Sequence, residues 1–284
     1  MENQKNSSWG LNLSPNKSET KKGVSKEMNL QQAADKLYEA EKKCCQIDMI
    51  SAENPGMTID DAYQIQLINV KRKLSEGEKL IGMKIGLTSK AMQKLLNVDV
   101  PDYGHLTDRM LVLEGETCHA NQLIQPKVEG EVAFCLKETL KGPGLTTADV
   151  YAATDYVVPA LEIVDSRIKN WKFKLADTIA DNGSSARLVV GSRMTPIHEV
   201  DMRLTGMNFE KNGELLSSGT TAEVWGNPAA AVAWLANQLS VYGIELKKNS
   251  IVLAGALTAA TPVVSGDFVT ASFQGMGSVE VKFD

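Results

Sequence analysis

Apolar residues recur at helical spacing near the start of the chain. Between Leu30 and Cys44 they return every three or four residues, which predicts an amphipathic helix. Further along, Thr58 stands three residues before Asp61, a variant of the capping box that predicts the start of a second helix. Residues 28–78 are therefore expected to form a helical N-terminal section.

The rest of the chain consists of short apolar runs that are separated by glycine and proline, a pattern typical of strands. The predicted strands are 80–85, 128–136, 156–165, 188–190, 207–211, 251–254, 268–273 and 279–283. One further helix is predicted after Asn227, which can cap the alanine-rich stretch 229–239. Because the strands do not alternate regularly with helices, we expect an α+β fold with a mixed, β-rich core over residues 79–284.

Composition and charge narrow the class of protein. Residues 1–27 are rich in Ser, Asn and Lys and predict a disordered tail. The 284-residue chain is 43% hydrophobic and 23% charged, as a soluble globular protein is, and its net charge of −5 gives no basic field for nucleic acid. No apolar run approaches the roughly 18 residues of a membrane span, and the N-terminus lacks a signal-peptide core. A cytoplasmic location is therefore expected.

Three glutamates interrupt the predicted strands. Glu129 and Glu131 project from the same face of one strand because side chains alternate between faces, and Glu162 lies in the next strand. Neighbouring carboxylates in apolar strands repel each other and lose hydration, so they require a cation or hydrogen-bond donors. A hard cation such as Mg²⁺ or Mn²⁺ prefers oxygen ligands. In the alternative interpretation, the strand is an exposed edge whose glutamates pair with lysines such as Lys127 and Lys137.

Further polar residues are candidates for chemistry. Lys84 is flanked by apolar residues, so it either faces an apolar site, where it can bind a carboxylate or transfer a proton, or lies on the exposed face of a strand. Asp102 lies in a stretch with the composition of a turn. Residues 177–185 are small and polar, which suits either a carboxylate-binding segment or a polar loop. The cysteines and histidines show no C-x-x-C or H-E-x-x-H spacing, so a zinc site is not expected.

Together these segments resemble the 2-hydroxypenta-2,4-dienoate (2-keto-4-pentenoate) hydratase family. That family has the fumarylacetoacetate hydrolase-like fold and includes 4-oxalocrotonate (2-oxo-3-hexenedioate) decarboxylases as a sister group. The motifs run in order from about residue 30 to the end of the chain: 84–93, 101–104, 126–131, 159–167, 180–182, 234–237 and 275–279. The resemblance therefore covers everything except the N-terminal tail.

The resemblance implies that Glu129, Glu131 and Glu162 bind Mg²⁺ or Mn²⁺ and that Lys84 and Asp102 are active-site residues. It also implies a small 2-oxo or 2-hydroxydienoic acid as substrate, a homo-oligomer, and a place in the meta-cleavage catabolism of aromatic compounds. In both sister reactions a cation can stabilise the negative charge that moves on to the 2-oxo oxygen. The surrounding acids and bases then decide between water addition and loss of CO₂.

The motifs divide between the two reactions. Asp102 resembles the hydratases, in which an acid here can handle protons or position water, whereas the decarboxylases of the family carry an apolar residue. Ser184, Ser185 and Arg187 look more like the decarboxylases and are the expected substrate-binding residues, with Arg187 able to pair with a distal carboxylate. We favour hydration of 2-hydroxypenta-2,4-dienoate to 4-hydroxy-2-oxopentanoate. Decarboxylation is the alternative, and C–C hydrolysis of an acylpyruvate, which usually needs a His–Glu pair, is a more distant one.

Overall fold

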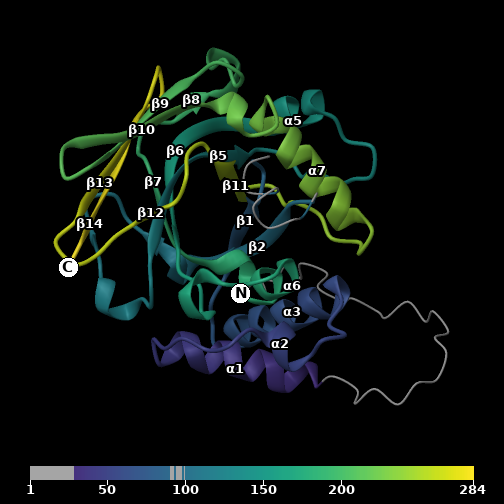
Figure 1. Ribbon diagram of the computed structural model, residues 1–284. Helices are drawn as coiled ribbons and strands as arrows, with labels where there is room; N and C mark the ends of the chain where they lie inside the picture. The colour runs from purple at the N-terminus through teal and green to yellow at the C-terminus, as the bar shows by residue number, and fades with distance from the viewer. Residues whose placement is uncertain (1–28, 90–92, 94–97, 99) are drawn as a thin grey trace, which may run out of the picture.

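The computed structural model describes residues 29–89, 93, 98 and 100–284. The expected disordered tail, residues 1–27, lies outside the described residues. The described chain forms a strongly curved mixed sheet, a smaller sheet packed against one side of it, and a group of helices below (Figure 1). This arrangement confirms the expected α+β class with a β-rich core.

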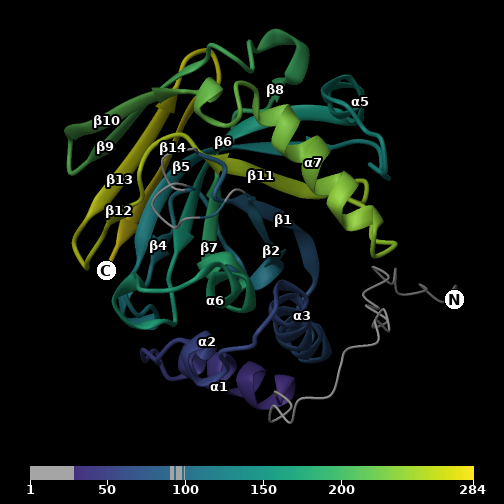
Figure 2. The ribbon, with the colours of Figure 1, turned by 45° about the vertical axis from the view of Figure 1, so that its right-hand side comes forward.

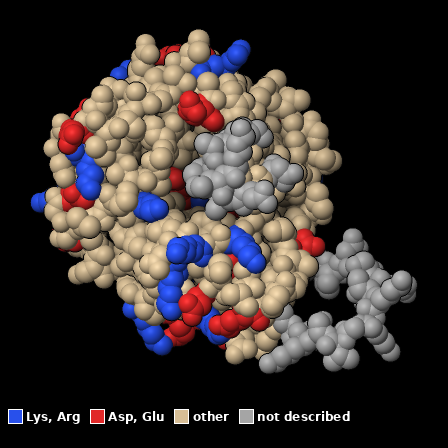
Figure 3. Space-filling model, in the orientation of Figure 1, with Lys and Arg blue, Asp and Glu red and all other residues tan. Residues whose placement is uncertain are grey.

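The helical section contains α1 (Leu30–Lys42), α2 (Ile50–Glu53) and α3 (Ile59–Ser75). The predicted capping box is present, because Thr58 Oγ1 accepts from the Asp61 amide at 3.1 Å and Asp61 Oδ2 accepts from the Thr58 amide at 2.9 Å. On the surface of this section Lys and Arg side chains lie among Asp and Glu side chains (Figure 3), and Lys73 pairs with Glu41 at 2.6 Å. None of the helices in the described part of the chain is long and apolar enough to cross a membrane.

Nine described strands form the large sheet, in the order β2-β1-β11-β5-β6-β7-β3, with β12 beside β5 and β8 beside β6. Its strands are β1 (Leu80–Gly86), β2 (Asp102–Thr107), β3 (Leu111–Val112), β5 (Lys127–Leu136), β6 (Thr154–Val164), β7 (Ser185–Val190), β8 (Thr195–Pro196), β11 (Ile251–Ala256) and β12 (Thr261–Pro262). The pair β1–β11 is parallel, whereas β5 pairs antiparallel with both β11 and β6. Because β7 also contacts β2, the sheet curls into an incomplete barrel (Figures 1 and 2).

The smaller sheet has the order β10-β9-β13-β14-β4, and its strands β13 and β14 contact β6. Its strands are β4 (Thr117–Cys118), β9 (Gly206–Lys211), β10 (Glu214–Thr220), β13 (Phe268–Phe273) and β14 (Gly277–Phe283). On other sides of the curved sheet, α7 (Pro228–Ser240) contacts β1, β11 and α5 (Thr147–Ala153), and α6 (Leu175–Ala180) contacts α3 and β2. The main apolar core fills the space between these layers.

A second, smaller apolar cluster lies inside the curve of the large sheet. Its members are Leu106, Met110, Ala133, Val158, Ala160, Leu188 and Leu253. The register places Ala133 opposite Leu253, and Ala160 opposite both Glu131 and Val190, so the inner face carries apolar residues together with Glu131. The inside of the barrel is therefore packed with side chains up to the level at which the charged residues begin.

The structure corrects two local expectations. Asp102 begins the buried strand β2 rather than standing in a turn, because pairing with β1 overrides the local composition. Residues 177–185 do not form a loop throughout. They continue α6, pass through the short helix η4 (Asn182–Ser184) and enter β7. Asp177 accepts from the Ser51 amide at 2.7 Å, which ties α6 to the helical section.

Candidate metal centre and catalytic pocket

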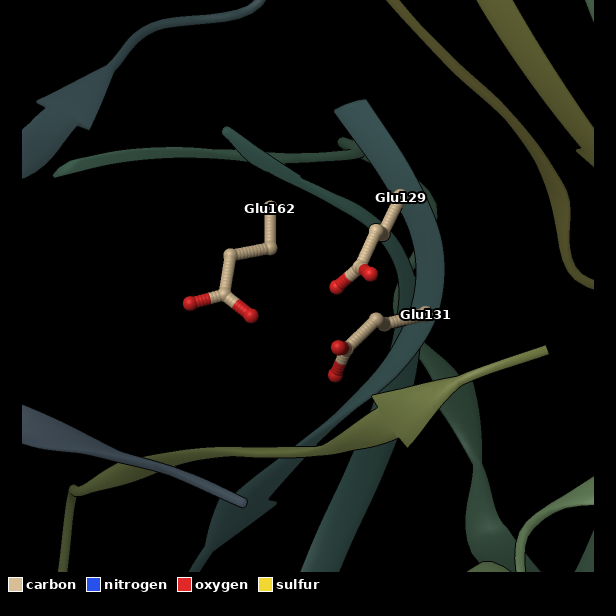
Figure 4. A group of neighbouring side chains, drawn as sticks. All are labelled: Glu129, Glu131 and Glu162. Atoms are coloured by element: carbon tan, nitrogen blue, oxygen red, sulfur yellow. The ribbon is translucent and has the colours of Figure 1, made fainter. Parts of the chain in front are cut away.

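Three carboxylates, two of them buried and one half-buried, meet on the inner face of the curved sheet. Glu129 lies directly opposite Glu162 in the β5–β6 pair, and Glu131 follows on the same face of β5. The three side chains point toward one another (Figure 4), and their ligand oxygens all lie within 4.8 Å of each other. Because β5 lies between β11 and β6, the alternative of an exposed edge strand is wrong.

The carboxylates accept few hydrogen bonds from the described part of the protein. Glu131 Oε2 accepts from the Gly255 amide at 2.8 Å, but neither oxygen of the buried Glu162 has a hydrogen-bond partner among the described residues. Burial and the Glu162 charge raise the pKa of Glu129 to about 7, and burial with the Glu162 and Glu129 charges raises the pKa of Glu131 well above 4.5. Buried acceptors without partners are costly. An all-oxygen donor set with orphaned buried oxygens fits a hard divalent cation such as Mg²⁺ or Mn²⁺.

Lys84 faces the carboxylates from β1. It is only 4% exposed, and its Nζ lies 3.6 Å from Glu162 Oε1, so the alternative of an exposed lysine is wrong. Burial alone lowers the pKa of Lys84, but the neighbouring carboxylates, led by Glu162 and Asp102, raise it above the usual value. Lys84 is therefore a buried ammonium. A Cβ added to Gly183 would lie 2.7 Å from Lys84 Cε, so the lysine packs closely against this glycine.

Asp102 completes the group from β2, where it is paired with Gly86 of β1. A Cβ added to Gly86 would lie 2.1 Å from Asp102 Oδ1 and 3.1 Å from Lys84 Nζ, so both groups pack against this glycine. Thr178 Oγ1 of α6 donates to Asp102 Oδ2 at 3.2 Å, whereas Oδ1 is buried and has no hydrogen-bond partner in the part of the chain that the structure describes. One oxygen of Asp102 is thus held in place, and the other remains available for a ligand. Sequence reasoning missed Thr178, because its stretch was interpreted as a polar segment.

A cavity of about 680 Å³ adjoins Glu129 and Glu131. Its other lining residues come from the end of β1, from the segment around the short helix η6 (Thr221–Glu223) and from the end of β11: Ile85, Gly86, Leu87, Thr88, Ser89, Ala222, Glu223, Trp225, Gly226, Ala256, Leu257, Thr258, Ala259 and Ala260. This volume is in the range of small-molecule sites, which hold roughly 300–1,000 Å³. A small acid can therefore enter beside the carboxylates.

The expected substrate-binding serines are buried near Lys84 and Asp181. The Ser184 hydroxyl donates to Asp181 Oδ2 at 3.2 Å, and the Ser185 hydroxyl is buried and has no hydrogen-bond partner within the described ranges. Both follow Gly183, which packs against Lys84. Neither serine is among the residues that line the large cavity.

Arg187 does not lie on the face of the sheet that carries the three glutamates. It is paired with Ile163, whereas the next residue of β7, Leu188, is paired with Glu162, so Arg187 projects from the opposite face of the sheet. There it lines a separate hollow of about 260 Å³ together with Glu41 and Cys44. The structure therefore does not bring Arg187 to the carboxylates.

The histidines do not face the carboxylates either. His105 lies opposite Met83, one residue before Lys84, and so points to the other face of the sheet. Its Nδ1 lies 2.9 Å from the amide oxygen of Gln66, and burial lowers its pKa to about 4. His119 and His198 are exposed on the surface. Among the described residues, no histidine therefore provides the His–Glu pair of a C–C hydrolase at this site.

The family described as fumarylacetoacetate (FAA) hydrolase C-terminal matches residues 83–284, a range that contains all the residues of this site. The chain belongs to this family. Its relatives also confirm the resemblance to the hydratase and decarboxylase group within the fold. A 2-hydroxyhexa-2,4-dienoate hydratase from Comamonas testosteroni is 44% identical over 250 residues, which are 87% of this chain and 95% of that protein. A 2-hydroxypent-2,4-dienoate hydratase from Pseudomonas putida is 46% identical over 216 residues, or 76% and 97% of the two chains.

A solved structure gives the same result at the level of the fold. The 4-oxalocrotonate decarboxylase from Pseudomonas putida G7, complexed with magnesium and adipate, matches with a TM-score of 0.88 and 40% identity. The match covers 90% of this chain and 97% of the decarboxylase. Hydratases and decarboxylases are thus both similar to this chain, so the choice between them depends on the residues of the site.

Proposed function

We propose that this protein is a metal-dependent lyase that adds water to 2-hydroxypenta-2,4-dienoate and forms 4-hydroxy-2-oxopentanoate, in the meta-cleavage catabolism of aromatic compounds. The observation that carries this proposal is Asp102. It is a buried acid with one unpartnered oxygen, packed against the same glycine as Lys84. Hydration requires an acid–base group near the carboxylate cluster, and Asp102 can provide it. Two relatives, at 44% and 46% identity, are named as dienoate hydratases.

Glu129, Glu131 and Glu162 are the proposed ligands of Mg²⁺ or Mn²⁺, in agreement with the magnesium in the related decarboxylase. When bound, the cation supplies Lewis-acid stabilisation of the charge that develops on the 2-oxo oxygen of the substrate. The Lys84 ammonium adds positive charge beside Glu162 and can bind the acidic end of the substrate.

The Asp102 carboxylate has the second chemical role in this proposal. Its free Oδ1 can hold a water molecule or move a proton, while the Thr178 hydrogen bond keeps Oδ2 in place. The dienol substrate first loses the proton of its 2-hydroxyl group and gains one at C5, which gives the conjugated enone. Water addition at C4 of this enone then needs a group that orients the water and takes up its proton. The site therefore separates charge stabilisation by Lys84 from proton handling by Asp102.

The second candidate is 4-oxalocrotonate decarboxylase, which the similarity to the solved decarboxylase favours. Two positions speak against it. Asp102 is an acid at the place where the resemblance leads us to expect an apolar residue in a decarboxylase, and Arg187, the expected partner of a distal carboxylate, faces away from the carboxylate cluster. C–C hydrolysis of an acylpyruvate is less well supported, because His105 is bonded to Gln66 on the other face of the sheet.

The remaining parts of the proposal concern the protein as a whole. We expect a homo-oligomer in the cytoplasm that acts on a small acid, with neither nucleic acid nor a membrane as partner. We keep Ser184 and Ser185 as proposed substrate-binding residues because they follow Gly183, which packs against Lys84. Arg187 can bind a substrate only in the separate hollow that it lines.

The reaction is tested by offering 2-hydroxypenta-2,4-dienoate and 2-oxo-3-hexenedioate separately with Mg²⁺. Ultraviolet decay of each substrate, CO₂ release and formation of the 4-hydroxy product are followed in parallel. We expect water addition to the dienoate, with slower CO₂ release from the diacid. Faster CO₂ release than hydration would assign the protein to the decarboxylases, and turnover of neither acid would reject both functions.

Replacing Thr178 by Val tests how Asp102 is positioned, since Val has a similar shape but no hydroxyl. We expect kcat to fall by roughly ten-fold with KM nearly unchanged, because a hydrogen bond to a charged group is worth about 1.5–3 kcal/mol and the loss is partly relieved by rearrangement. Thr178→Ser keeps the donor and should retain most of the wild-type kcat. Equal losses in the Val and Ser variants would instead indicate that Thr178 acts through packing.

A further inference from the structure

A left-handed turn lies next to Lys84. It consists of the three residues of η4, Asn182, Gly183 and Ser184, which have φ 57°, 60° and 56°. Residues with a Cβ rarely adopt this region, and they seldom do so in succession. Those that do need support from the surrounding structure, and they cluster at functional sites. Glycine accounts for one of the three positions, so the other two need a separate cause.

The side chain of Asn182 provides this support. Its Oδ1 accepts from the His105 amide at 2.8 Å, and its Nδ2 donates to the His105 carbonyl oxygen at 2.9 Å. A residue of a neighbouring antiparallel strand makes the same pair of bonds. Because β2 ends the order of the large sheet, Asn182 occupies an edge at which the structure describes no further hydrogen-bonded strand. Asn182 therefore fixes the turn to the strand that carries Asp102.

The turn approaches both β2 and Lys84 closely. A Cβ added to Gly104 of β2 would lie 2.4 Å from the Asn182 carbonyl oxygen, so the turn lies directly against the strand. At the next residue of the turn, a Cβ added to Gly183 would lie 2.7 Å from Lys84 Cε and 3.1 Å from Lys84 Nζ. The backbone at Gly183 is therefore one wall of the space that holds the lysine side chain.

The same turn is tied to the strand that carries Glu162. The Ser184 carbonyl oxygen accepts from the amide of Asp165, which directly follows β6, at 2.7 Å. Lys84 Nζ lies 3.6 Å from Glu162 Oε1, which is longer than a hydrogen bond. A lysine has a flexible four-carbon stem, so this ion pair alone does not fix the ammonium. Its position therefore depends on the groups that pack against the stem.

We propose that Asn182 is a positioning residue that acts through Lys84. Its two bonds to His105 hold the left-handed turn against β2, and the backbone of the turn at Gly183 keeps the Lys84 ammonium beside Glu162. Without the Asn182 amide, the turn is free to move away from β2, and the lysine side chain gains room. The inference goes beyond the proposed function and rests on it only in that Lys84 binds the acidic end of the substrate.

Asn182→Gly tests this role against a matched control, Asn212→Gly. Asn212 also has a left-handed φ, of 56°, and is also followed by glycine. Its side-chain amide also makes two hydrogen bonds, since it accepts from the Phe268 amide and donates to Asp267, each at 2.8 Å. It lies between β9 and β10 of the smaller sheet. Glycine removes two bonds and relieves the backbone at either position, so each variant should lower Tm by no more than about 5 °C.

Only the variant at Asn182 should change ligand binding and turnover. The Kd of 2-oxopentanoate, an unreactive 2-oxo acid, is measured by calorimetry with saturating Mg²⁺. We expect Asn182→Gly to raise this Kd by roughly five-fold or more, as a weakened bond to a charged group does. We expect kcat for the dienoate to fall by roughly 10- to 100-fold, because a misplacement of about 1 Å can cost about 10²-fold. Asn212→Gly should leave both values unchanged, and the rise in Tm that Mg²⁺ produces should persist in both variants.

A double-mutant cycle with Lys84→Ala identifies the residue through which Asn182 acts. If the turn works by holding Lys84, Asn182→Gly should change the Kd of 2-oxopentanoate by less than about two-fold once residue 84 is alanine, because coupled residues are not additive. Asn182→Asp provides a second variant for the same comparisons. Asp tolerates the left-handed region and still accepts from the His105 amide, but its carboxylate cannot donate to the His105 carbonyl oxygen. It should therefore behave like Asn182→Gly.

The inference is overturned if Asn182→Gly and Asn212→Gly have the same Kd and kcat, or if the effect of Asn182→Gly on Kd is undiminished in the Lys84→Ala protein. Should Asn182→Gly not fold, wild-type Kd and kcat values in Asn182→Asp would overturn it. These outcomes leave the proposed reaction standing if the wild type hydrates the dienoate. Conversely, a protein that hydrates no dienoate, but binds 2-oxopentanoate more weakly in Asn182→Gly than in Asn212→Gly, supports the positioning role and rejects the hydratase assignment.

Discussion

Glu131→Gln is expected to reduce Mg²⁺-dependent turnover on the order of 10³-fold, because Lewis-acid stabilisation of the developing charge is worth several kcal/mol. The same variant should lose the rise in Tm that Mg²⁺ produces in the wild type. Without metal, however, its Tm should equal or exceed that of the wild type, since one of three mutually repelling carboxylates has become neutral. Turnover and thermal unfolding, each measured with Mg²⁺ and with EDTA, check these outcomes.

The stability of the metal-free protein should depend on pH in a defined direction. The pKa of Glu129 is raised from 4.5 to about 7, so the folded state binds this proton more tightly than the unfolded state does. A raised carboxylate pKa therefore makes a stabilising contribution that is present at low pH and is lost as the pH rises from 4.5 to about 7. Mg²⁺ must displace the proton of Glu129, so the affinity of the protein for Mg²⁺ should rise over the same pH range.

The control for both experiments is Glu138→Gln. This variant neutralises an exposed carboxylate that lies outside the cluster, 3.9 Å from Lys248 Nζ. It should change neither turnover nor the response of Tm to Mg²⁺. A wild-type protein whose Tm is indifferent to Mg²⁺ at pH 8, or a fully active Glu131→Gln variant, would contradict the assignment of the three glutamates as metal ligands.

The placement of Glu129 and Glu131 side by side was predictable from the sequence because its signal is local. Glu129 and Glu131 are separated by one residue, and the period of a strand alone places them on one face. The capping box at Thr58 and the cap at Asn227 are equally local, and both helices begin where these residues predict. Each of these predictions depends on neighbours along the chain and needs no knowledge of tertiary contacts.

The position of Arg187 was not predictable, because it depends on strand register. A shift of one residue in the β6–β7 pair would have placed Arg187 opposite Glu162 and on the inner face. The pair also contains an irregularity between Ile163 and Val164, and such irregularities leave no clear mark in the sequence. Thr178 was missed for a related reason, since its partner Asp102 lies 76 residues away along the chain.

Asp102→Asn separates the two chemistries of this family. Asparagine keeps the size of the side chain and can still accept from Thr178, but it cannot act as a base at the position of the free oxygen. General acid–base assistance contributes typically 10²–10⁴-fold, so hydration should fall by roughly that factor. The Kd of 2-oxopentanoate with Mg²⁺ should stay close to the wild-type value, because the carboxylate cluster and Lys84 are unchanged.

Lys84→Ala provides the contrast to Asp102→Asn. It removes the buried ammonium 3.6 Å from Glu162 Oε1, so it should both weaken binding of the 2-oxo acid and slow turnover. Loss of CO₂ from a diacid generates its own electron pair and needs Asp102 less than water addition does. Any residual CO₂ release from 2-oxo-3-hexenedioate should therefore survive in Asp102→Asn and be lost in Lys84→Ala. Full hydratase activity in Asp102→Asn, measured as formation of 4-hydroxy-2-oxopentanoate, would show that the proton is handled by another group.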